Sequence, residues 1–216
     1  LASSAGAVSA ASGHPDLTEI AVSGGWHVYL VDGSETVSSL DYEPVVAEGV
    51  DESQHGWLPI SAAWMLDPEA LPVHLSPHGP SDWERVQAEP VPHDLRGPVG
   101  WVRQQIGLTG TMDRVPELPR TELPEVEVTD IRQDRTSISF TVSQPGVPVL
   151  VKTSYFPNWV AEGAEGPYRV SPNLMVVVPT STNVRITYTR TPVDLVASAM
   201  SLLGLVGLFL LARRPQ

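Results

Sequence analysis

Residues 136–155, TSISFTVSQPGVPVLVKTSY, carry the clearest strand pattern in this sequence. At the start of the stretch, Ile138, Phe140 and Val142 alternate with small polar residues, a period of two that is typical of a strand with one buried face. The Gln-Pro-Gly at 144–146 predicts a tight turn, because proline fixes φ and glycine accepts a positive φ. The stretch then returns to apolar and β-branched residues, which predict a second strand.

Segments of the same kind lie on both sides of this stretch. VEVTDI (126–131) precedes it, and NLMVVVP (173–179) and NVRITYTR (183–190) follow it. A polar RQDR at 132–135 separates the first two strands and is typical of a hairpin turn. Short strands joined by short turns, with no helical period, predict a mainly β fold, an antiparallel β-sandwich or jelly-roll-like module over residues 126–191.

The first half of the chain is less regular and is rich in proline and tryptophan. Small polar residues dominate 1–24 and predict a flexible linker from an upstream region. Residues 25–113 predict a mixed subdomain, and the proline- and charge-rich 114–125 predicts an extended, exposed connector. The elements expected in the subdomain are strands at 26–31 and 42–49 and a few short helices, at 81–87 and 97–107.

Composition narrows the classes of partner. The chain has 216 residues, a formal net charge of -12 and no cysteine. A surface this acidic repels the phosphates of nucleic acids, so we expect no nucleic-acid partner. The absence of cysteine excludes disulfides and thiolate metal sites.

Residues 192–212, PVDLVASAMSLLGLVGLFLLA, form an almost uninterrupted apolar run. A helix of this length, at about 1.5 Å per residue, matches the roughly 30 Å hydrocarbon core of a bilayer. Asp194 is the only charged residue in the run and falls in the first turn, where the head-group layer can hold it. The run predicts one C-terminal transmembrane helix, with a buried core helix as the alternative.

The charges after this run predict its orientation. Arg213 and Arg214 follow it directly, and the positive-inside rule places such a pair in the cytoplasm. We therefore expect a cell-membrane protein with residues 1–191 outside, 213–216 as a cytoplasmic tail, and the lipid bilayer as a partner.

Residues 149–211 contain an aromatic-Pro-x-Trp turn at 156–159, a Tyr-Arg pair, a Val-Pro step, and a Tyr-x-Arg-x-Pro strand end at 188–192 before the last helix. With these motifs, the stretch resembles the end of large multi-pass bacterial membrane proteins, the YfhO-like and related proteins of the glycosyltransferase-C type, particularly those of actinobacteria. Residues 26–46 also resemble the region that precedes this ending. Many members of the family have glycine where this chain has Asn158.

The resemblance implies that the chain is a C-terminal extracytoplasmic region with its last transmembrane helix. Such proteins transfer sugars from polyprenyl-phosphate donors, and their catalytic carboxylate lies in an early extracytoplasmic loop outside this sequence. The implied partners are upstream transmembrane helices of the same protein and cell-wall glycan or lipid-linked sugar. This chain itself is expected to be non-catalytic, although its parent protein is implied to be a glycosyltransferase.

The turn Phe156-Pro157-Asn158-Trp159 admits two interpretations. As a structural corner, it ends one strand and starts the next with Trp159 pointing inward. As a sugar-stacking platform, its neighbourhood would offer flat aromatic faces and hydrogen-bond donors, the features of pyranose sites. The candidate ligand-binding residues are Lys152, Tyr155, Trp159, Tyr168 and Arg169.

Other chemistry finds little support in the sequence. The group His74, His78, Asp82 and His93 lacks a helical frame for metal binding because Pro77 interrupts it. No nucleophile, phosphate-binding or dinucleotide motif is present. We therefore predict no catalytic residue, no cofactor and no metal. The acidic pairs, expected to be solvated surface with ordinary pKa values, are Asp41/Glu43, Asp51/Glu52 and Glu162/Glu165.

Two functions remain open. The first is an extracytoplasmic accessory domain and final membrane helix of a cell-envelope glycosyltransferase-like protein, binding or positioning the acceptor glycan. The second is a non-catalytic, membrane-anchored adhesion or scaffold module.

Overall fold

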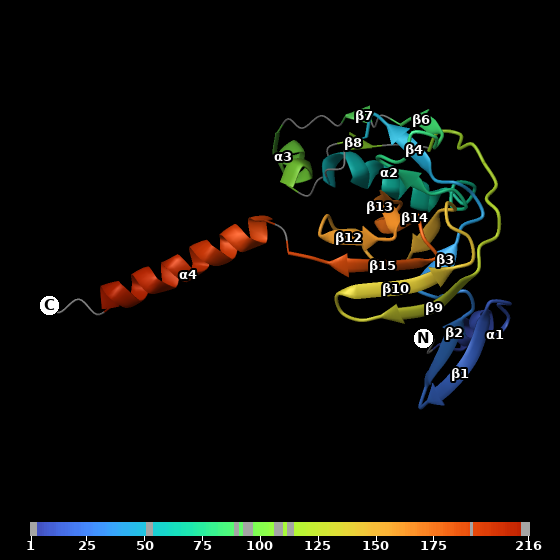
Figure 1. Cartoon of the computed structure of the whole chain (residues 1–216). Helices are drawn as coiled ribbons and strands as arrows, with labels where there is room; N and C mark the ends of the chain where they lie inside the picture. Colours follow the sequence, from blue (N-terminus) through green and yellow to red (C-terminus); the bar gives the residue numbers. More distant parts are fainter. Residues whose placement is uncertain are drawn as a thin grey trace.

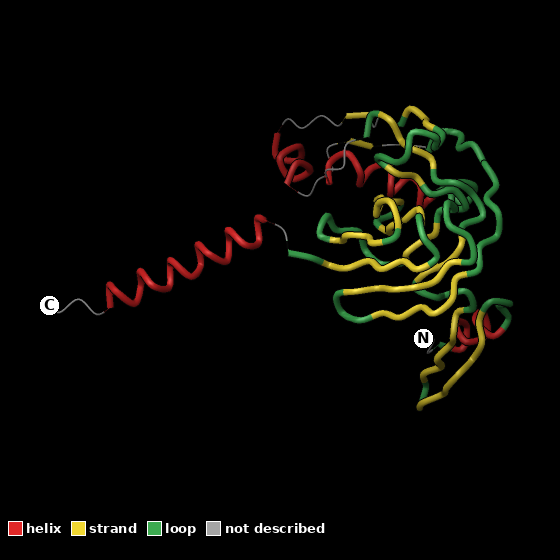
Figure 2. Tube along the Cα trace, viewed as in Figure 1, coloured by secondary structure: helices red, strands yellow, loops and turns green. Residues whose placement is uncertain are grey.

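The mainly β fold is confirmed by the computed structural model of the chain (Figures 1 and 2). Strands are the commonest regular element of the body; one helix is packed inside it, and the others lie at its edges or project from it. The residues that the structure describes are 4–50, 54–88, 91–92, 97–105, 110–111, 115–190 and 192–212.

Two four-stranded antiparallel sheets form the centre of the molecule. The first sheet has the order β12-β15-β10-β9, and the second has the order β13-β14-β11-β3. The strands of the first sheet are β9 (Val128–Gln133), β10 (Ser137–Val142), β12 (Trp159–Glu162) and β15 (Asn183–Tyr188). The strands of the second are β3 (Val37–Ser39), β11 (Val149–Val151), β13 (Ala164–Val170) and β14 (Leu174–Pro179).

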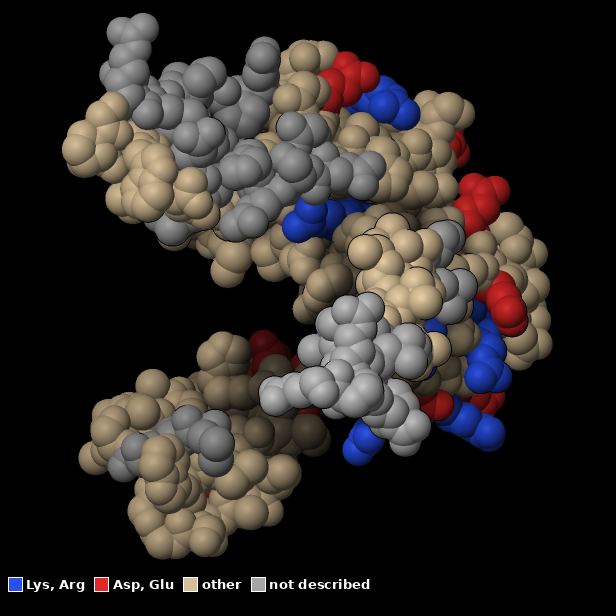
Figure 3. All heavy atoms as spheres, turned by 90° about the vertical axis from the view of Figure 1, so that its left-hand side faces the viewer, with Lys and Arg blue, Asp and Glu red and all other residues tan. Residues whose placement is uncertain are grey.

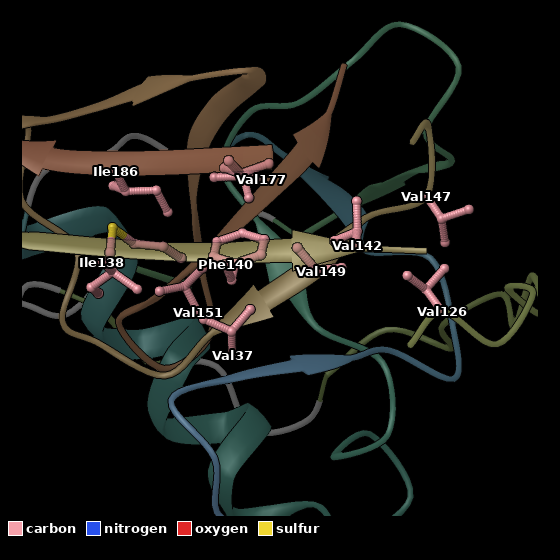
Figure 4. Close-up of a cluster of buried hydrophobic side chains, with 12 residues drawn as sticks. Val37, Val126, Ile138, Phe140, Val142, Val147, Val149, Val151, Val177 and Ile186 are labelled. Atoms are coloured by element: carbon pink, nitrogen blue, oxygen red, sulfur yellow. The ribbon is translucent and has the colours of Figure 1, made fainter. Parts of the chain in front are cut away.

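One hydrophobic core joins these two sheets (Figure 4). The predicted alternation in β10 is confirmed, since Ile138, Phe140 and Val142 are buried and the residues between them are partly exposed. They share a cluster with Val149 and Val177 of the second sheet. Each sheet also has an opposite face, whose side chains point away from this cluster and can make other contacts.

The turns around β10 follow the sequence closely. Asp134 closes the β9–β10 hairpin by accepting hydrogen bonds from the backbone N–H groups of Thr136 and Ser137 at 2.8 and 2.7 Å. These bonds hold the pKa of the Asp134 carboxyl below its usual value. After β10, Gly146 takes a φ of 89° and donates its N–H to the Pro179 carbonyl. Both predicted turns are confirmed.

A smaller parallel sheet, β5-β4-β6, lies beside the two main sheets. Its strands are β4 (Val45–Glu48), β5 (Leu75–Ser76) and β6 (Arg85–Gln87). The helix α2 (Gln54–Leu66) follows β4 along the chain and connects it to β5. Trp57, Ile60 and Trp64 bury its inner face against the sheet. A helical crossover is the usual way to connect two parallel strands.

Two segments of this region differ from the predictions. The short helix predicted at 81–87 is wrong, because Arg85–Gln87 is a strand paired with Val46–Glu48 and tertiary pairing overrides local preference. The helix α2 is not among the predicted elements; it contains Pro59 and so lacks a continuous helical signal. The other predicted short helix is confirmed as α3 (Gly97–Gln105). Two short paired strands, β7 (Val91–Pro92) and β8 (Gly110–Thr111), flank α3 in sequence.

Residues 171–172, which follow β13, link the main sheets to α2 and β5. The Ser171 N–H donates to the Leu75 carbonyl at 2.8 Å, and the Leu75 N–H donates to Ser171 Oγ at 3.0 Å. Trp57 Nε1 donates to the Pro172 carbonyl at 2.7 Å, and Ser61 Oγ donates to the same oxygen at 3.1 Å. These bonds make the two halves of the chain one packed unit.

The predicted division at 114–125 therefore does not separate two independent parts. β3, from the first half of the chain, is an edge strand of the second sheet and pairs with β11. Residues 115–125 run extended along the body, and backbone hydrogen bonds join Glu43 to Thr121 and Leu123 to Asp41. The proline content made this segment extended, but these bonds hold it against the fold.

The structure also differs from the predicted linker at residues 1–24. It contains α1 (Ala5–Ser12) and β1 (Leu17–Ser23), which pairs with β2 (Trp26–Val31), a predicted strand. Ser4 caps α1 by accepting the Ala7 N–H, and the alanine content favours the helix. Gly24, with a φ of 60°, allows the tight turn of the hairpin.

The final helix, α4 (Pro192–Ala212), follows β15 and projects away from the body (Figure 1). A helix over this range is as predicted. Six of its large apolar side chains are exposed, namely Val193, Val196, Met200, Leu202, Leu203 and Leu205. Within the described residues, no helix combines the length and hydropathy of a membrane span. The predicted tail 213–216 lies outside the described residues.

Candidate functional site: a polar groove on the first sheet

The candidate ligand residues from the sequence lie at separate places in the fold. Lys152 Nζ donates to the Gly33 carbonyl at 2.6 Å. The Tyr168 ring packs against Trp83, with 5.3 Å between ring centroids. Tyr155 and Arg169 do come together, with the guanidinium carbon 6.0 Å from the ring centroid. The proposed sugar platform is therefore not assembled as one surface.

Arg169 lies among residues that hold the fold together. Its guanidinium carbon is 5.2 Å from the centroid of the Trp57 ring, and its Nε donates to Asn173 Oδ1 at 2.8 Å. Trp57 is 1% exposed, so its ring offers no face to a ligand. A cleft of about 390 Å³ lies beside this cluster, and most of its lining is apolar, including Leu58, Met65 and Pro172. The contacts suit stability better than recognition of a polar ligand.

The aromatic turn at 156–159 has the geometry of a corner. The Trp159 N–H donates to the Phe156 carbonyl at 3.1 Å, and Trp159 Nε1 donates to the Ser154 carbonyl at 3.3 Å. The Trp159 ring meets Tyr188 edge to face, at 5.2 Å between centroids, and packs against the main core. This arrangement favours the corner interpretation of Trp159.

A polar groove of about 580 Å³ lies on the first sheet, on the face away from the core. Strand register places Arg132 of β9, Ser139 of β10, Arg185 of β15 and Glu162 of β12 in one cross-strand row. Neighbouring strands lie about 4.8 Å apart, so the two arginine Cα atoms flank Ser139 at roughly 10 Å from each other. Thr141 and Asn183 form the next row, with a 3.3 Å side-chain hydrogen bond.

The charged groups of this groove are available to a ligand. Within the described part of the chain, neither Arg132 nor Arg185 makes a side-chain hydrogen bond or ion pair. Asp130 also lines the groove, at a β-bulge between β9 and β10, and its φ of 52° lies in the left-handed region. A non-glycine residue in that region carries a backbone cost, which is frequent at functional sites.

The groove can recognise a polyhydroxylated ligand. Its two arginines balance the carboxylates of Asp130 and Glu162, and the hydroxyls of Ser139, Thr141 and Ser181 add donors and acceptors. Guanidinium groups donate in a fixed fork, and carboxylates accept from hydroxyl groups. Neighbouring hydroxyls on a sugar ring are complementary to such a set. The two carboxylates of the groove, Asp130 and Glu162, are exposed. The arrangement therefore indicates hydrogen bonding to a ligand rather than deprotonation of a substrate.

Sequence reasoning missed this groove because it depends on register. The residues come from strands up to 55 positions apart in the chain, as the Asp130 and Arg185 numbers show. The available signal was the polar half of each alternating strand, such as Ser139 and Thr141 in β10. That half identifies an outward face but not which strands lie beside one another.

His74 is the buried titratable group of the junction between α2 and the second sheet. Its Nδ1 lies 2.8 Å from the Ser171 carbonyl, to which it donates, and its ring stacks on Trp64 at 5.2 Å. Burial lowers the pKa of the imidazole, outweighing the opposite effect of the Ser171 carbonyl. The folded structure therefore favours the neutral form of the His74 imidazole.

This histidine predicts a pH dependence of stability. In the unfolded chain the histidine binds a proton at its usual pKa of about 6.5, and in the folded chain it does so only at a lower pH. The free energy of unfolding should therefore stay at its highest value above that pKa and fall as the pH drops below it. Chemical denaturation at pH values from about 7.5 to about 5, which bracket that pKa, measures the slope. His74→Asn, which keeps a donor for Ser171, should flatten it, whereas His14→Asn at an exposed histidine should not. Equal slopes in all three proteins would contradict the assignment.

The acidic pairs are only partly as predicted. Glu43 differs, because burial and then the charges of Asp82 and Glu84 raise the pKa of its carboxyl above the usual value. Glu162 lines the groove, and Asp51/Glu52 lies outside the described residues. Within the described ranges, no group of three or more His, Cys, Asp or Glu could hold a metal ion.

Comparison with known proteins returned no match to a protein-family model, a curated protein or a solved structure.

Proposed function

We propose that this chain is the extracytoplasmic accessory domain and final membrane helix of a cell-envelope glycosyltransferase-like protein that uses polyprenyl-phosphate sugars. Its groove on the first sheet binds or positions the acceptor glycan. The observation that supports this most strongly is the row of Arg132, Ser139, Arg185 and Glu162, in which two guanidinium groups without a partner among the described residues lie beside hydroxyls and carboxylates.

The proposal includes attachment to a membrane through α4. Support comes from the exposed apolar side chains of this helix and from its projection away from the body (Figure 1). Its one acidic residue, Asp194, is in the first turn. The remaining support is the sequence itself, in which the apolar run continues to Ala212 and ends at two arginines. In this proposal, residues 1–191 lie outside the membrane.

The chemistry of transfer is assigned to another part of the parent protein. The resemblance implies that the family's catalytic carboxylate lies in an upstream loop, and both carboxylates of the groove, Asp130 and Glu162, are exposed. A non-catalytic adhesion module would use the same groove. The two differ in what lies upstream of Leu1, because a glycosyltransferase of this type has many further membrane spans there.

The groove predicts a specific loss of glycan binding. Arg132→Ala combined with Arg185→Ala should weaken binding by more than about tenfold, because a hydrogen bond to a charged group contributes about 1.5 to 3 kcal/mol. The measurement is calorimetric titration of the full chain in detergent with a panel of neutral bacterial cell-wall oligosaccharides.

Arg135→Ala is the matched control, since Arg135 is exposed in the β9–β10 turn and does not line the groove. All these arginines are exposed, so the melting temperature should change little in either variant. Unchanged glycan affinity in the double variant, or equal losses in the double variant and the control, would contradict the proposal.

A further inference from the structure

An exposed aromatic cluster lies where the body meets α4. It consists of Phe156, Trp159 and Tyr188, which we call the root cluster. Tyr188 contacts both partners, with ring centroids 6.5 Å from Phe156 and 5.2 Å from Trp159. Phe156 is 51% exposed and Tyr188 is 40% exposed, whereas the Trp159 ring is half-buried and anchors the cluster to the core. Large aromatic side chains held this far out of the fold indicate an interaction surface.

Hydrogen bonds tie the root cluster to the first turn of α4. Asn158, between Phe156 and Trp159 in the turn, donates through Nδ2 to the Thr189 carbonyl at 3.0 Å and to Asp194 Oδ2 at 3.2 Å. The Thr189 N–H donates back to the Asn158 carbonyl at 2.8 Å. The aromatic turn and the start of the helix are thus one local structure, and a surface that receives α4 also meets the root cluster.

A second apolar patch lies at the same edge of the molecule. In Figure 1, α3 lies at the edge of the body from which α4 projects. Its side chains Val99, Trp101 and Val102 are exposed, Trp101 by 61%. Figure 3, viewed from the side toward which α4 projects, shows that most of the described side chains on this face are uncharged; the charged ones lie mainly along one edge, with a few also near the middle.

We propose that the root cluster and the exposed side of α3 lie in the head-group layer of the bilayer that holds α4, so that the domain has one fixed orientation on the membrane. This inference rests on the proposed membrane attachment. Tryptophan and tyrosine favour the membrane–water interface because their rings are apolar with one polar group. The net charge of -12 makes zwitterionic lipid the fitting surface, since anionic head groups would repel the domain.

This orientation keeps the groove free for its ligand. β15 runs from the groove toward α4 (Figure 1), so the strands of the first sheet point at the membrane and their outer face does not lie on it. A glycan could then enter the groove from the side while the root cluster stays in contact with lipid.

Single-cysteine labelling tests this directly, because the chain has no cysteine of its own. We would place one nitroxide label at a time in the full chain, reconstituted in phosphatidylcholine vesicles with or without phosphatidylglycerol. The test positions are Phe156→Cys and Val99→Cys, with Leu203→Cys in α4 and Gly25→Cys at the β1–β2 turn as references. Accessibility to oxygen and to a water-soluble nickel complex gives the depth of each label.

The expected result is a deep Leu203 label, Phe156 and Val99 labels at the interface, and a Gly25 label in water. The added anionic lipid should make the Phe156 and Val99 labels shallower. An aqueous Leu203 label would overturn the membrane attachment itself. A deep Leu203 label with aqueous Phe156 and Val99 labels would overturn only the present inference. Protection of the Phe156 and Val99 labels that increases with protein density would also overturn it, by assigning the surface to a second copy of the chain.

Discussion

Replacement of Trp57 by alanine should lower the free energy of unfolding by about 3 to 5 kcal/mol, the usual cost of removing a large buried aromatic side chain. Trp57 is 1% exposed and belongs to the core between α2 and the parallel sheet. It also donates to the Pro172 carbonyl and lies under the Arg169 guanidinium. The alanine variant therefore loses a core residue and a link between the halves of the molecule together.

Trp101→Ala is the matched control for this experiment. It makes the same chemical change at a tryptophan that is exposed on α3, where an effect within about 0.5 kcal/mol is expected in detergent. Trp57→Phe should fall between them, because it keeps an aromatic ring and loses one hydrogen bond of about 1 kcal/mol. Urea denaturation in detergent gives all three values. Equal stability of the two alanine variants would contradict the position of Trp57 in the fold.

Gly163→Ala should lower stability by about 2 to 5 kcal/mol, the sum of a left-handed backbone penalty and of overpacking. Gly163 has a φ of 78° between β12 and β13, and a Cβ built there would lie 2.6 Å from Ser181 Oγ and closer still to the Asn183 carbonyl oxygen. Its own carbonyl accepts the Thr180 and Ser181 N–H groups, so the turn has little freedom to move away.

Gly146→Ala separates the two causes. Gly146 has a similar φ of 89°, but nothing lies within 4 Å of its built Cβ. That variant should show the backbone penalty alone, about 1 to 2 kcal/mol. The difference between the two glycine variants in thermal or urea unfolding then measures the crowding beside the groove. Equal losses in the free energy of unfolding for Gly146→Ala and Gly163→Ala would contradict the close packing around Gly163.

The sequence predicts the main sheets well because their information is local. In β10, alternation alone identifies the buried face of Ile138, Phe140 and Val142, and proline with glycine identifies the turn that follows. The parallel strand β6 and the helix α2 are different, because their stability comes from contacts with β4 and with the core rather than from their own residues. Local preference cannot identify such segments.

The candidate site was also harder to predict, because it depends on contacts between residues far apart in the sequence. Aromatic and cationic residues close in sequence, such as Lys152 and Tyr155, suggested a platform, but Lys152 donates to the Gly33 carbonyl whereas Tyr155 lies beside Arg169. The groove uses residues that look ordinary one at a time, Arg132 and Arg185 among them, and register alone brings them together. The junction at His74 and Ser171 likewise joins residues 97 positions apart.

Hydrogen–deuterium exchange of the full chain, with and without a cell-wall oligosaccharide that it binds, tests the glycan-binding role of the groove most directly. We expect bound glycan to slow exchange in β9, β10 and the segment from Ser181 to Arg185, while amides near Leu58 and Asn173 in the apolar cleft keep their rates. Slower exchange confined to that cleft, or no change in the strands of the groove at saturating glycan, would contradict it.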